Sequence, residues 1–331
     1  MTPEIQKLLQ GQDDILDYDA IIKKFSWLVQ KDQNCILSPD SDGLLCGLLM
    51  SYYLDWKIRG FYDGKVLAVK QGINPQECIF LDMEIFRSSI RSVGQHMVMY
   101  DKDDLPPNWN NLDRCVSANN LRNYDFKNNF KLKYPFGTVH LLLSILGQNR
   151  KIPIPKNAVS PLLYTDGTFK NQFNYPENCL SWLDFLGASH MNNPLQKVFL
   201  NRHYSTYELM VELKDLFSKI NVIGGGKRGG DKIKISDSRG NITNIDPRSH
   251  QLRIGINTQA EDFLRMLAGK TGWSFIPSHW SWGPYKITRF KKGSIKPGKA
   301  RYGALLAKNP ISLAIISRNS IEYTIDGNGM L

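Results

Sequence analysis

Cysteine is scarce and scattered in this chain of 331 residues, and no two cysteines form a Cys-x-x-Cys pair. Their odd number and wide spacing exclude a disulfide framework and a zinc ribbon. We interpret them as small buried apolar side chains in a reducing compartment. The five cysteines are Cys35, Cys46, Cys78, Cys115 and Cys179.

Long apolar runs are missing as well. No stretch reaches the ~18 consecutive apolar residues that a membrane-spanning helix needs, and His140 and Ser144 interrupt the longest apolar run, 139–146. Residues 1–15 lack the basic start and apolar centre of a secretory signal. The sequence therefore predicts a soluble, cytoplasmic protein without a membrane partner.

Acidic residues are absent from 263–320, whereas the same segment holds eleven lysines and arginines, as many as the net charge of +11. Aromatic residues alternate with these cations, and single-stranded nucleic acid binds such a mixture of positive charge and stacking faces. A solvated basic face over an aromatic core is the alternative. The residues that we expect to contact nucleic acid are Lys286, Arg289, Lys291, Lys292, Lys296, Lys299, Arg301, Trp280 and Trp282.

Short apolar segments alternate with helical patterns over the first half of the chain, which is typical of a mostly parallel sheet covered by helices. The sequence predicts an α/β fold in which such a sheet, flanked by helices, precedes a smaller α+β C-terminal domain. The expected strands are 35–38, 65–69, 78–82 and 97–100, and the expected helices include 44–56 and 134–147.

The length favours two domains, at roughly 150 residues per domain. We expect a first unit at 1–200 that contains the mostly parallel sheet, a helical and glycine-rich linker at 201–230, and a basic, aromatic-rich binding domain at 231–331. The linker contains Lys227 and Arg228 between glycines, so its backbone amides and these two cations offer a grip for phosphate; a flexible connection is the alternative. In the last domain we expect hairpin strands at 232–236, 241–245 and 251–256 and a helix at 260–269.

Carboxylates follow the predicted strands, at the edge of a parallel sheet where ligands bind. Asp40 and Asp42 follow the first strand, and Asp82 ends the apolar segment CIFLD. A lone carboxylate in such a place is costly unless a cation neutralises it. With His96 and Asp166 from later motifs, these residues form the ligand set that we expect for one or two Mn²⁺ or Mg²⁺ ions. Taken singly, a turn or a helix cap would explain each of them.

Four segments together resemble the signature motifs of the DHH phosphoesterase family, in order and rough spacing. They are ILSPDSDGLLCGLL, CIFLDMEI, VGQHMV and LLYTDGTF, and the resemblance covers about residues 30–190. The family includes RecJ-type single-strand exonucleases, nano-RNA and cyclic-dinucleotide phosphodiesterases and family II inorganic pyrophosphatases.

The resemblance implies a manganese-dependent phosphodiesterase or nuclease. In it, Asp40 would bind a first metal, Asp42 a second, Asp82 would bridge the two, and His96 and Asp166 would complete the second site. Asp82 and His96 are thus the expected catalytic residues. The long positive segment favours a nucleic-acid strand over a cyclic dinucleotide as substrate. A protein partner or a second copy of the chain stays open.

Two departures from the family pattern support an alternative. Ile36 or Ser38 stands where the family has a further His or Asp, and Gly94-Gln95-His96 replaces Asp-His-His. A degenerate relative that binds nucleic acid or a partner protein without turnover would fit these changes, because lost ligands weaken metal binding steeply. The segment ILSPDSDGLL also loosely resembles the pyrophosphate loop of ATP pyrophosphatases, although Pro39 removes an amide from it.

Overall fold

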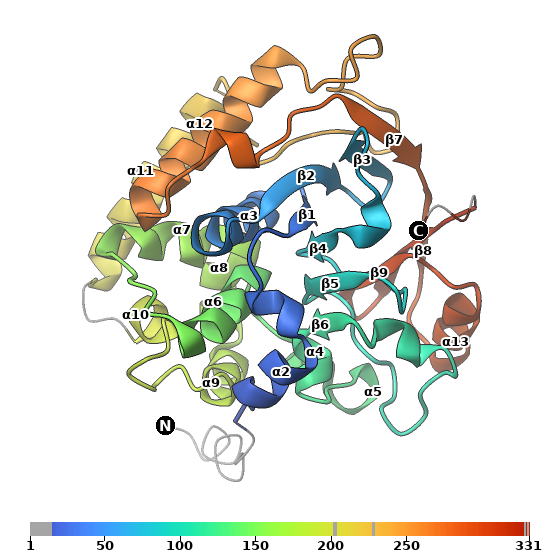
Figure 1. The fold of residues 1–331 in the computed structure, drawn as a ribbon. Coiled ribbons are helices and arrows are strands. Elements are labelled where there is room, and N and C mark those ends of the chain that lie inside the picture. Colours follow the sequence, from blue (N-terminus) through green and yellow to red (C-terminus); the bar gives the residue numbers. More distant parts are fainter. Residues whose placement is uncertain (1–14, 201–203, 227–228, 328, 330) are drawn as a thin grey trace.

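A seven-stranded sheet forms the centre of the computed structural model, which describes residues 15–200, 204–226, 229–327, 329 and 331 (Figure 1). Its strand order is β6-β5-β4-β1-β2-β3-β7, and a second sheet has the order β8-β10-β9. The strands are β1 (Asn34–Leu37), β2 (Lys57–Tyr62), β3 (Val66–Lys70), β4 (Ile79–Leu81), β5 (Arg91–Gly94), β6 (Cys115–Ser117), β7 (Tyr285–Arg289), β8 (Lys291–Ile295), β9 (Ser312–Ser317) and β10 (Ser320–Ile325).

The helices that surround these sheets come from every part of the described chain. The α-helices are α2 (Tyr18–Lys24), α3 (Ser41–Leu54), α4 (Ala118–Leu121), α5 (Phe126–Asn129), α6 (Thr138–Asn149), α7 (Val159–Tyr164), α8 (Thr168–Asn174), α9 (Pro176–Phe185), α10 (Leu195–Phe199), α11 (Thr206–Ile223), α12 (Ile254–Thr271) and α13 (Lys299–Ala307). The 3-10 helices are η1 (Ser26–Val29), η2 (Pro75–Glu77), η3 (Trp109–Leu112), η4 (Phe130–Leu132), η5 (Lys156–Ala158), η6 (Thr165–Gly167) and η7 (Pro277–His279).

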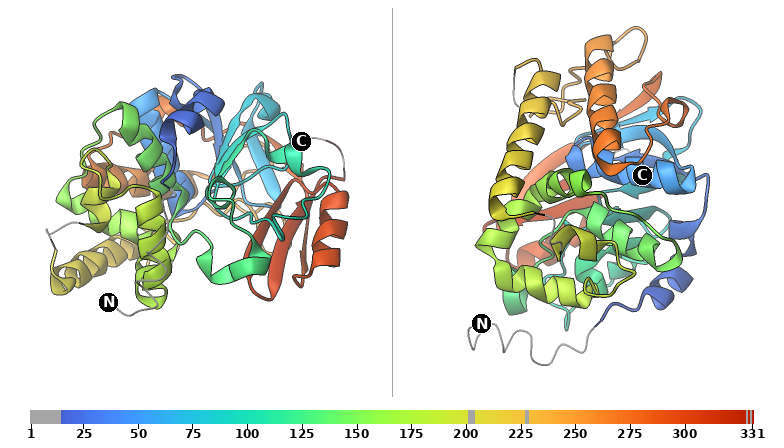
Figure 2. Two further views of the ribbon diagram at one scale, coloured as in Figure 1. Left: turned by 90° about the horizontal axis from the view of Figure 1, so that it is seen from below. Right: turned by 90° about the vertical axis from the view of Figure 1, so that its left-hand side faces the viewer.

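The predicted α/β class is confirmed. Strands β2, β1, β4, β5 and β6 run parallel to one another, whereas β3 pairs antiparallel with β2 and with β7 at one edge. Figure 2 shows the helical layer on one side and the small antiparallel sheet with α13 on the other. None of the helices in the described ranges combines the length and apolarity that crossing a bilayer requires.

The two faces of the large sheet bury different residues, as the alternation of side chains along a strand dictates. Leu37 of β1 belongs to the main core beneath α3 and α6, whereas Ile36 faces a separate cluster with Phe80 and, from the C-terminal part, Ile311. The strands are apolar on both faces, which is why β1 and β4 appear in the sequence as continuous apolar runs.

The chain after the predicted linker contributes to both sheets. Strand β7 pairs with β3, and α12 packs against α3, so segments from 1–200 and from 231–331 share the seven-stranded sheet. The division into 1–200, 201–230 and 231–331 stays a prediction.

Some predicted elements were wrong in position. MVMY (97–100) is not a strand; the strand here is β5, which precedes it, and Met99 makes only an isolated bridge to Asp125. The expected hairpin strands at 232–256 reduce to two isolated bridges, Ser236 with Ile242 and Ile245 with Leu252. Polar turns interrupt the apolar alternation there, and α12 begins at Ile254, within the last expected strand.

Candidate metal centre

The candidate site lies at the ends of three neighbouring parallel strands. The register aligns Leu37 of β1 with Leu81 of β4, and Leu81 with Val93 of β5, so the three strands end at one level. Asp82 directly follows β4, and His96 comes two residues after β5 ends. The correction to β5 therefore matters, because His96 lies after a strand, at the ligand-binding edge of the sheet, rather than before one.

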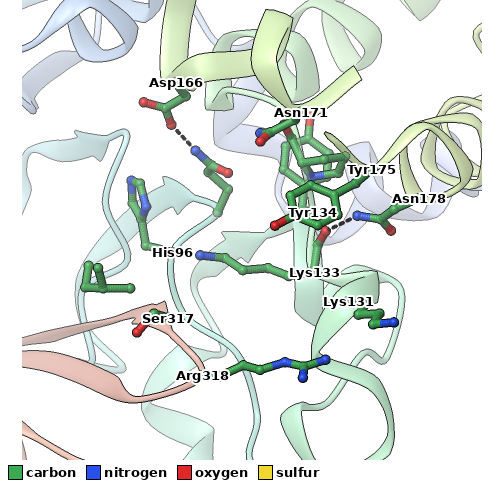
Figure 3. A pocket seen from close by; sticks show the side chains of 13 residues that line it. His96, Lys131, Lys133, Tyr134, Asp166, Asn171, Tyr175, Asn178, Ser317 and Arg318 are labelled. Atoms are coloured by element: carbon green, nitrogen blue, oxygen red, sulfur yellow. Dashed lines mark hydrogen bonds between the residues drawn. The ribbon is translucent and has the colours of Figure 1, made fainter. Parts of the chain in front are cut away.

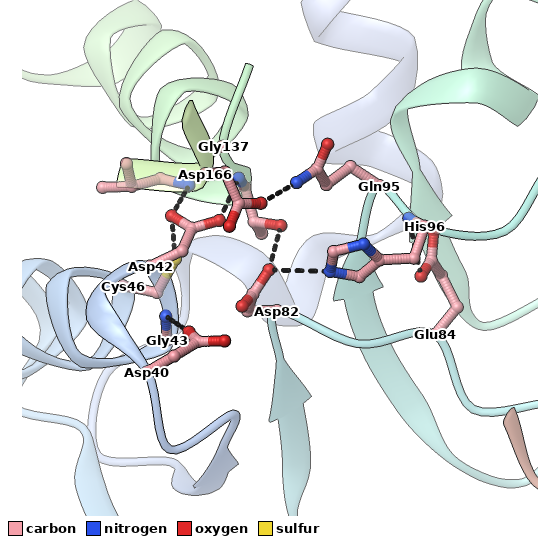
Figure 4. A network of polar contacts seen from close by, with 12 residues as sticks. Asp40, Asp42, Gly43, Cys46, Asp82, Glu84, Gln95, His96, Gly137 and Asp166 are labelled. Atoms are coloured by element: carbon pink, nitrogen blue, oxygen red, sulfur yellow. Dashed lines mark hydrogen bonds and ion pairs between the residues drawn. The ribbon is translucent and has the colours of Figure 1, made fainter. Parts of the chain in front are cut away.

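Asp82 occupies the middle of the site (Figure 4). It is 2% exposed, and its backbone has φ +63°, a left-handed conformation that costs a non-glycine residue about 1–2 kcal/mol. Its Oδ1 accepts a hydrogen bond from Thr138 Oγ1 at 2.8 Å and lies 3.4 Å from His96 Nε2. Its Oδ2 is buried and has no hydrogen-bond partner among the described residues.

Asp166 reaches the same point from the helical layer. It lies in η6, the turn between α7 and α8, and also has a positive φ of +50°. Gln95 Nε2 donates a hydrogen bond to Asp166 Oδ2. Ligand atoms of Asp82, His96 and Asp166 all lie within 4.8 Å of one another, so the structure brings three of the five predicted ligands together.

Asp40 and Asp42 have additional structural roles. Asp40 is the N-cap of α3 and accepts a hydrogen bond from Gly43 N at 3.2 Å. Asp42 is fully buried and accepts from Thr138 N at 2.6 Å and Val139 N at 3.1 Å, at the N-terminus of α6. The helix-cap interpretation is therefore correct for Asp40, whereas Asp42 lies inside α3 and bonds to the N-terminus of α6. The charges of both act on neighbouring carboxylates, as the electrostatics below show.

Burial and neighbouring charges raise the pKa of three carboxylates in this cluster. Burial raises the pKa of Asp42 well above its usual range, and the Asp82 charge adds to the effect. Burial also raises the pKa of Asp82, with Asp40 and Asp166 contributing next. Burial, followed by the Asp42 charge, raises the pKa of Asp166 to about 7. Four carboxylates with this mutual repulsion form a site that a cation would stabilise.

Glu84 fixes the position of His96. Its carboxylate is 2% exposed and accepts hydrogen bonds from His96 N, Met97 N and Ser117 Oγ, each at 3.1 Å. Asn119 Nδ2 holds the same turn by donating to the Met97 carbonyl at 3.2 Å. A side chain that fixes a ligand from behind typically tunes its metal affinity.

The donor set fits a hard divalent cation. Carboxylate oxygens with one imidazole suit Mn²⁺, and the unpartnered Asp82 Oδ2 gives it a buried acceptor to bind. Of the two positions where the resemblance would place a further ligand, Ile36 is fully buried on the opposite face of β1, whereas Ser38 lines a cleft together with Asp40 and Asp82.

Most of the residues that we expected to bind nucleic acid lie away from this cluster. Lys292 lines a cleft beside it, but pairs with Glu322. Trp280 is only 5% exposed and lies against Phe275 and Trp282, so its ring faces are covered; that stacking prediction was wrong. The remaining predicted residues lie on β7 (Lys286, Arg289), on β8 (Lys291), before or in α13 (Lys296, Lys299, Arg301), in the stack over Phe61 (Trp282), or outside the described residues (Lys227, Arg228).

Sequence reasoning missed several residues around the site. Glu84 had a signal, because it follows Asp82 by two residues in CIFLDMEI. Lys232 and Lys234 alternate with Ile233, a pattern that exposes the two lysines on one side. Lys133 had none, since long-range folding alone brings it near the cluster.

Comparison with models of protein families, with curated proteins and with solved structures gave no match. The likeness to the DHH motifs thus remains a resemblance of four short segments, and the function has to be argued from the geometry of the site.

Proposed function

We propose that this protein is a metal-dependent phosphodiesterase that acts on nucleic acid or oligonucleotides. The observation that carries the proposal is the convergence of Asp82, His96 and Asp166 at the carboxyl edge of the sheet, with a buried, unpartnered oxygen on Asp82. Asp82 and Asp166 both have a left-handed backbone conformation, and costly conformations of this kind persist where function requires them.

Asp82, His96 and Asp166 would hold the ion, with Asp40 and Asp42 completing its charge balance. A bound Mn²⁺ or Mg²⁺ would lower the pKa of water and offset the charge of a phosphodiester. The His96 side chain is about one third exposed and its Nε2 faces Asp82 Oδ1, so its neutral imidazole would bind the ion from the solvent side of the site.

Cations beside the cluster would bind the phosphates. Lys133 and Arg318 line the cleft at Asp166 (Figure 3), and Lys232 and Lys234 line the cleft at Asp40. Such lysines and arginines neutralise phosphates without reading sequence. These residues support a nucleic-acid ligand better than the distant basic residues of β7 and α13 do.

The second candidate is a protein that binds nucleic acid without hydrolysing it. It is favoured by Gln95, whose neutral amide donates to Asp166 where the family pattern has a histidine, and by the apolar Ile36. Binding that weakens with salt is common to both candidates, whereas dependence on Mn²⁺ belongs only to the first.

The experiment uses end-labelled single-stranded DNA and RNA, incubated with the protein in Mn²⁺ or in chelator. We expect metal-dependent shortening that Asp82→Asn abolishes while binding persists. Asp101→Asn is the matched control, because Asp101 is a buried carboxylate that Lys127 neutralises at 2.7 Å. Hydrolysis retained in Asp82→Asn would refute the metal site, and binding without shortening in all lanes would favour the second candidate.

A further inference from the structure

Two clefts meet at the acidic cluster. One, the Asp166 cleft, has a volume of about 710 Å³ and contains Gln95 and Asp166. The other, the Asp40 cleft, has a volume of about 470 Å³ and contains Asp40 and Asp82. Each volume is within the roughly 300–1,000 Å³ typical of small-molecule sites. His96 lines both clefts, so the candidate centre lies at their junction rather than at the bottom of either.

The small antiparallel sheet forms one wall of both clefts. Ile316 of β9 lines both, Arg318 of the β9–β10 turn lines the Asp166 cleft, and Tyr323 of β10 lines the Asp40 cleft. This common wall gives the two clefts a continuous path past His96. Both clefts are partly open to solvent.

The Asp166 cleft offers a phosphate grip and a stacking face. Lys133 Nζ donates to the Ile315 carbonyl at 3.0 Å, and an ammonium group has two further donors for a ligand. Figure 3 shows its amine directed towards His96, with Arg318 on the facing wall. Tyr175 is 51% exposed at the rim, and its ring can stack on a base.

The Asp40 cleft has its own cations. Lys65 and Lys292 pair with acidic residues of the same cleft, but Lys232 and Lys234 are exposed and make no ion pair within the described part of the chain. Between them Ile233 is 2% exposed, and its N–H donates to the Pro39 carbonyl at 2.8 Å. This bond fixes both lysines beside the loop that carries Asp40.

From these features we infer that a single strand of nucleic acid crosses the cluster with nucleotides in both clefts, so that bonds inside the strand are hydrolysed. The inference rests on the proposed phosphodiesterase function. It narrows the substrate to a single strand that can be cut without a free end. The oxygen of water forms a bond to phosphorus, the bond from phosphorus to one ester oxygen breaks, and that oxygen takes up a proton. The products are one fragment with a terminal phosphate and one with a hydroxyl.

The decisive substrates are covalently closed single-stranded circles of DNA and RNA, compared with linear strands of the same sequence in Mn²⁺. We expect the circles to be opened and then shortened. Shortening of linear strands with intact circles would overturn the two-sided path and leave the phosphodiesterase function standing. If neither form is cut, the proposed function itself fails, which is a different outcome.

The lysines give a second test. Binding to a linear strand is measured in chelator at several salt concentrations. The slope of the logarithm of the binding constant against the logarithm of the salt concentration should become less steep by about 0.7 for each phosphate contact removed. The double change Lys232→Gln with Lys234→Gln should therefore reduce that slope by about 1.4, and should lower kcat/KM on circles at least tenfold. Lys151→Gln, an exposed lysine that lines neither cleft, should change neither quantity. An unchanged slope in the double variant would exclude the Asp40 cleft from the strand's path.

Discussion

Asp82 holds a carboxylate in a buried place that opposes its charge. The side chain is 2% exposed, Oδ2 has no partner among the described residues, and the charges of Asp40 and Asp166 oppose its ionisation. Asparagine has the same shape and keeps an oxygen for the Thr138 hydroxyl, but carries no charge. We therefore predict that Asp82→Asn stabilises the protein in chelator and removes the stabilisation that Mn²⁺ gives the wild type.

The size of both effects follows from the burial of this group. An unsatisfied buried acceptor costs about 1–3 kcal/mol. For a chain of 331 residues the entropy of unfolding is about 0.7 kcal/mol/K, so this relief raises Tm by roughly 1.5–4 °C. Mn²⁺ at about 100 times its Kd would stabilise the wild type by ~2.7 kcal/mol, or about 4 °C. The order of stability of the two proteins should thus reverse on adding metal wherever the relief is below ~2.7 kcal/mol, and more metal extends that range.

The assay is thermal unfolding of wild type and Asp82→Asn, each in chelator and in a Mn²⁺ series. Asp101→Asn is the control, because it breaks a contact with Lys127 and should lower Tm equally in both buffers. A variant that is less stable than wild type in chelator, together with a wild type that ignores Mn²⁺, would refute the metal centre. It would mean that Asp82 serves the fold alone.

Three further predictions test the surroundings of the site. Glu84→Gln should weaken Mn²⁺ affinity about 10–100-fold, because Glu84 fixes the backbone of His96; a metal titration showing less than a twofold change would contradict this role. Gly137→Ala should destabilise the fold by about 1–3 kcal/mol in denaturant unfolding, since its Cβ would lie 2.8 Å from Asp42 Oδ1, and an unchanged midpoint would show that this approach is not tight. Burial lowers the pKa of His140 to about 4, so the folded chain keeps it neutral while the unfolded chain protonates it below ~6.5. The protonation of His140 in the unfolded chain therefore leaves the free energy of unfolding unchanged above pH 6.5 and lowers it by about 3 kcal/mol as the pH drops to 4. In urea unfolding, the free energy of unfolding of His140→Leu should fall less steeply with decreasing pH than that of the wild type. An equally steep fall would assign the acid sensitivity to other groups.

The sequence predicted the part of the site that depends on local order along the chain. Strands β1 and β4 are short apolar runs that end at acidic residues, and parallel strands that are neighbours in a sheet end at the same edge. These two facts were enough to predict that Asp40 and Asp82 lie at the same cleft. The observed register aligns Leu37 with Leu81, the last residues of β1 and β4, so the two strands do end at the same edge of the sheet.

His96 does lie beside Asp82 and Asp166, but it reaches that place differently from what we expected. We assumed a strand after it, at 97–100, because MVMY is apolar; the strand is instead β5, before it, and Glu84 holds the turn in between. Burial of Met97 and Val98 in a separate cluster with Tyr302 explains the misassignment, since they are apolar for contacts with the C-terminal segment rather than for sheet pairing.

The cations of the site were the part that the sequence located least well. The charge excess at 263–320 drew attention to β7 and α13, yet β7 is needed as a partner for β3, and Lys299 pairs with Asp104. Arg318 and Lys292 of that segment do line the clefts, but Lys133 and Lys232 come from outside it. Their position depends on pairing and packing between residues that are distant in sequence, such as the hydrogen bond from Lys133 to the Ile315 carbonyl. Charge along a sequence therefore indicates how strongly a chain attracts a polyanion. The place where a strand would bind depends instead on which cations the fold brings beside the carboxylates. The salt dependence of the lysine variants consequently tests the site more directly than net charge does.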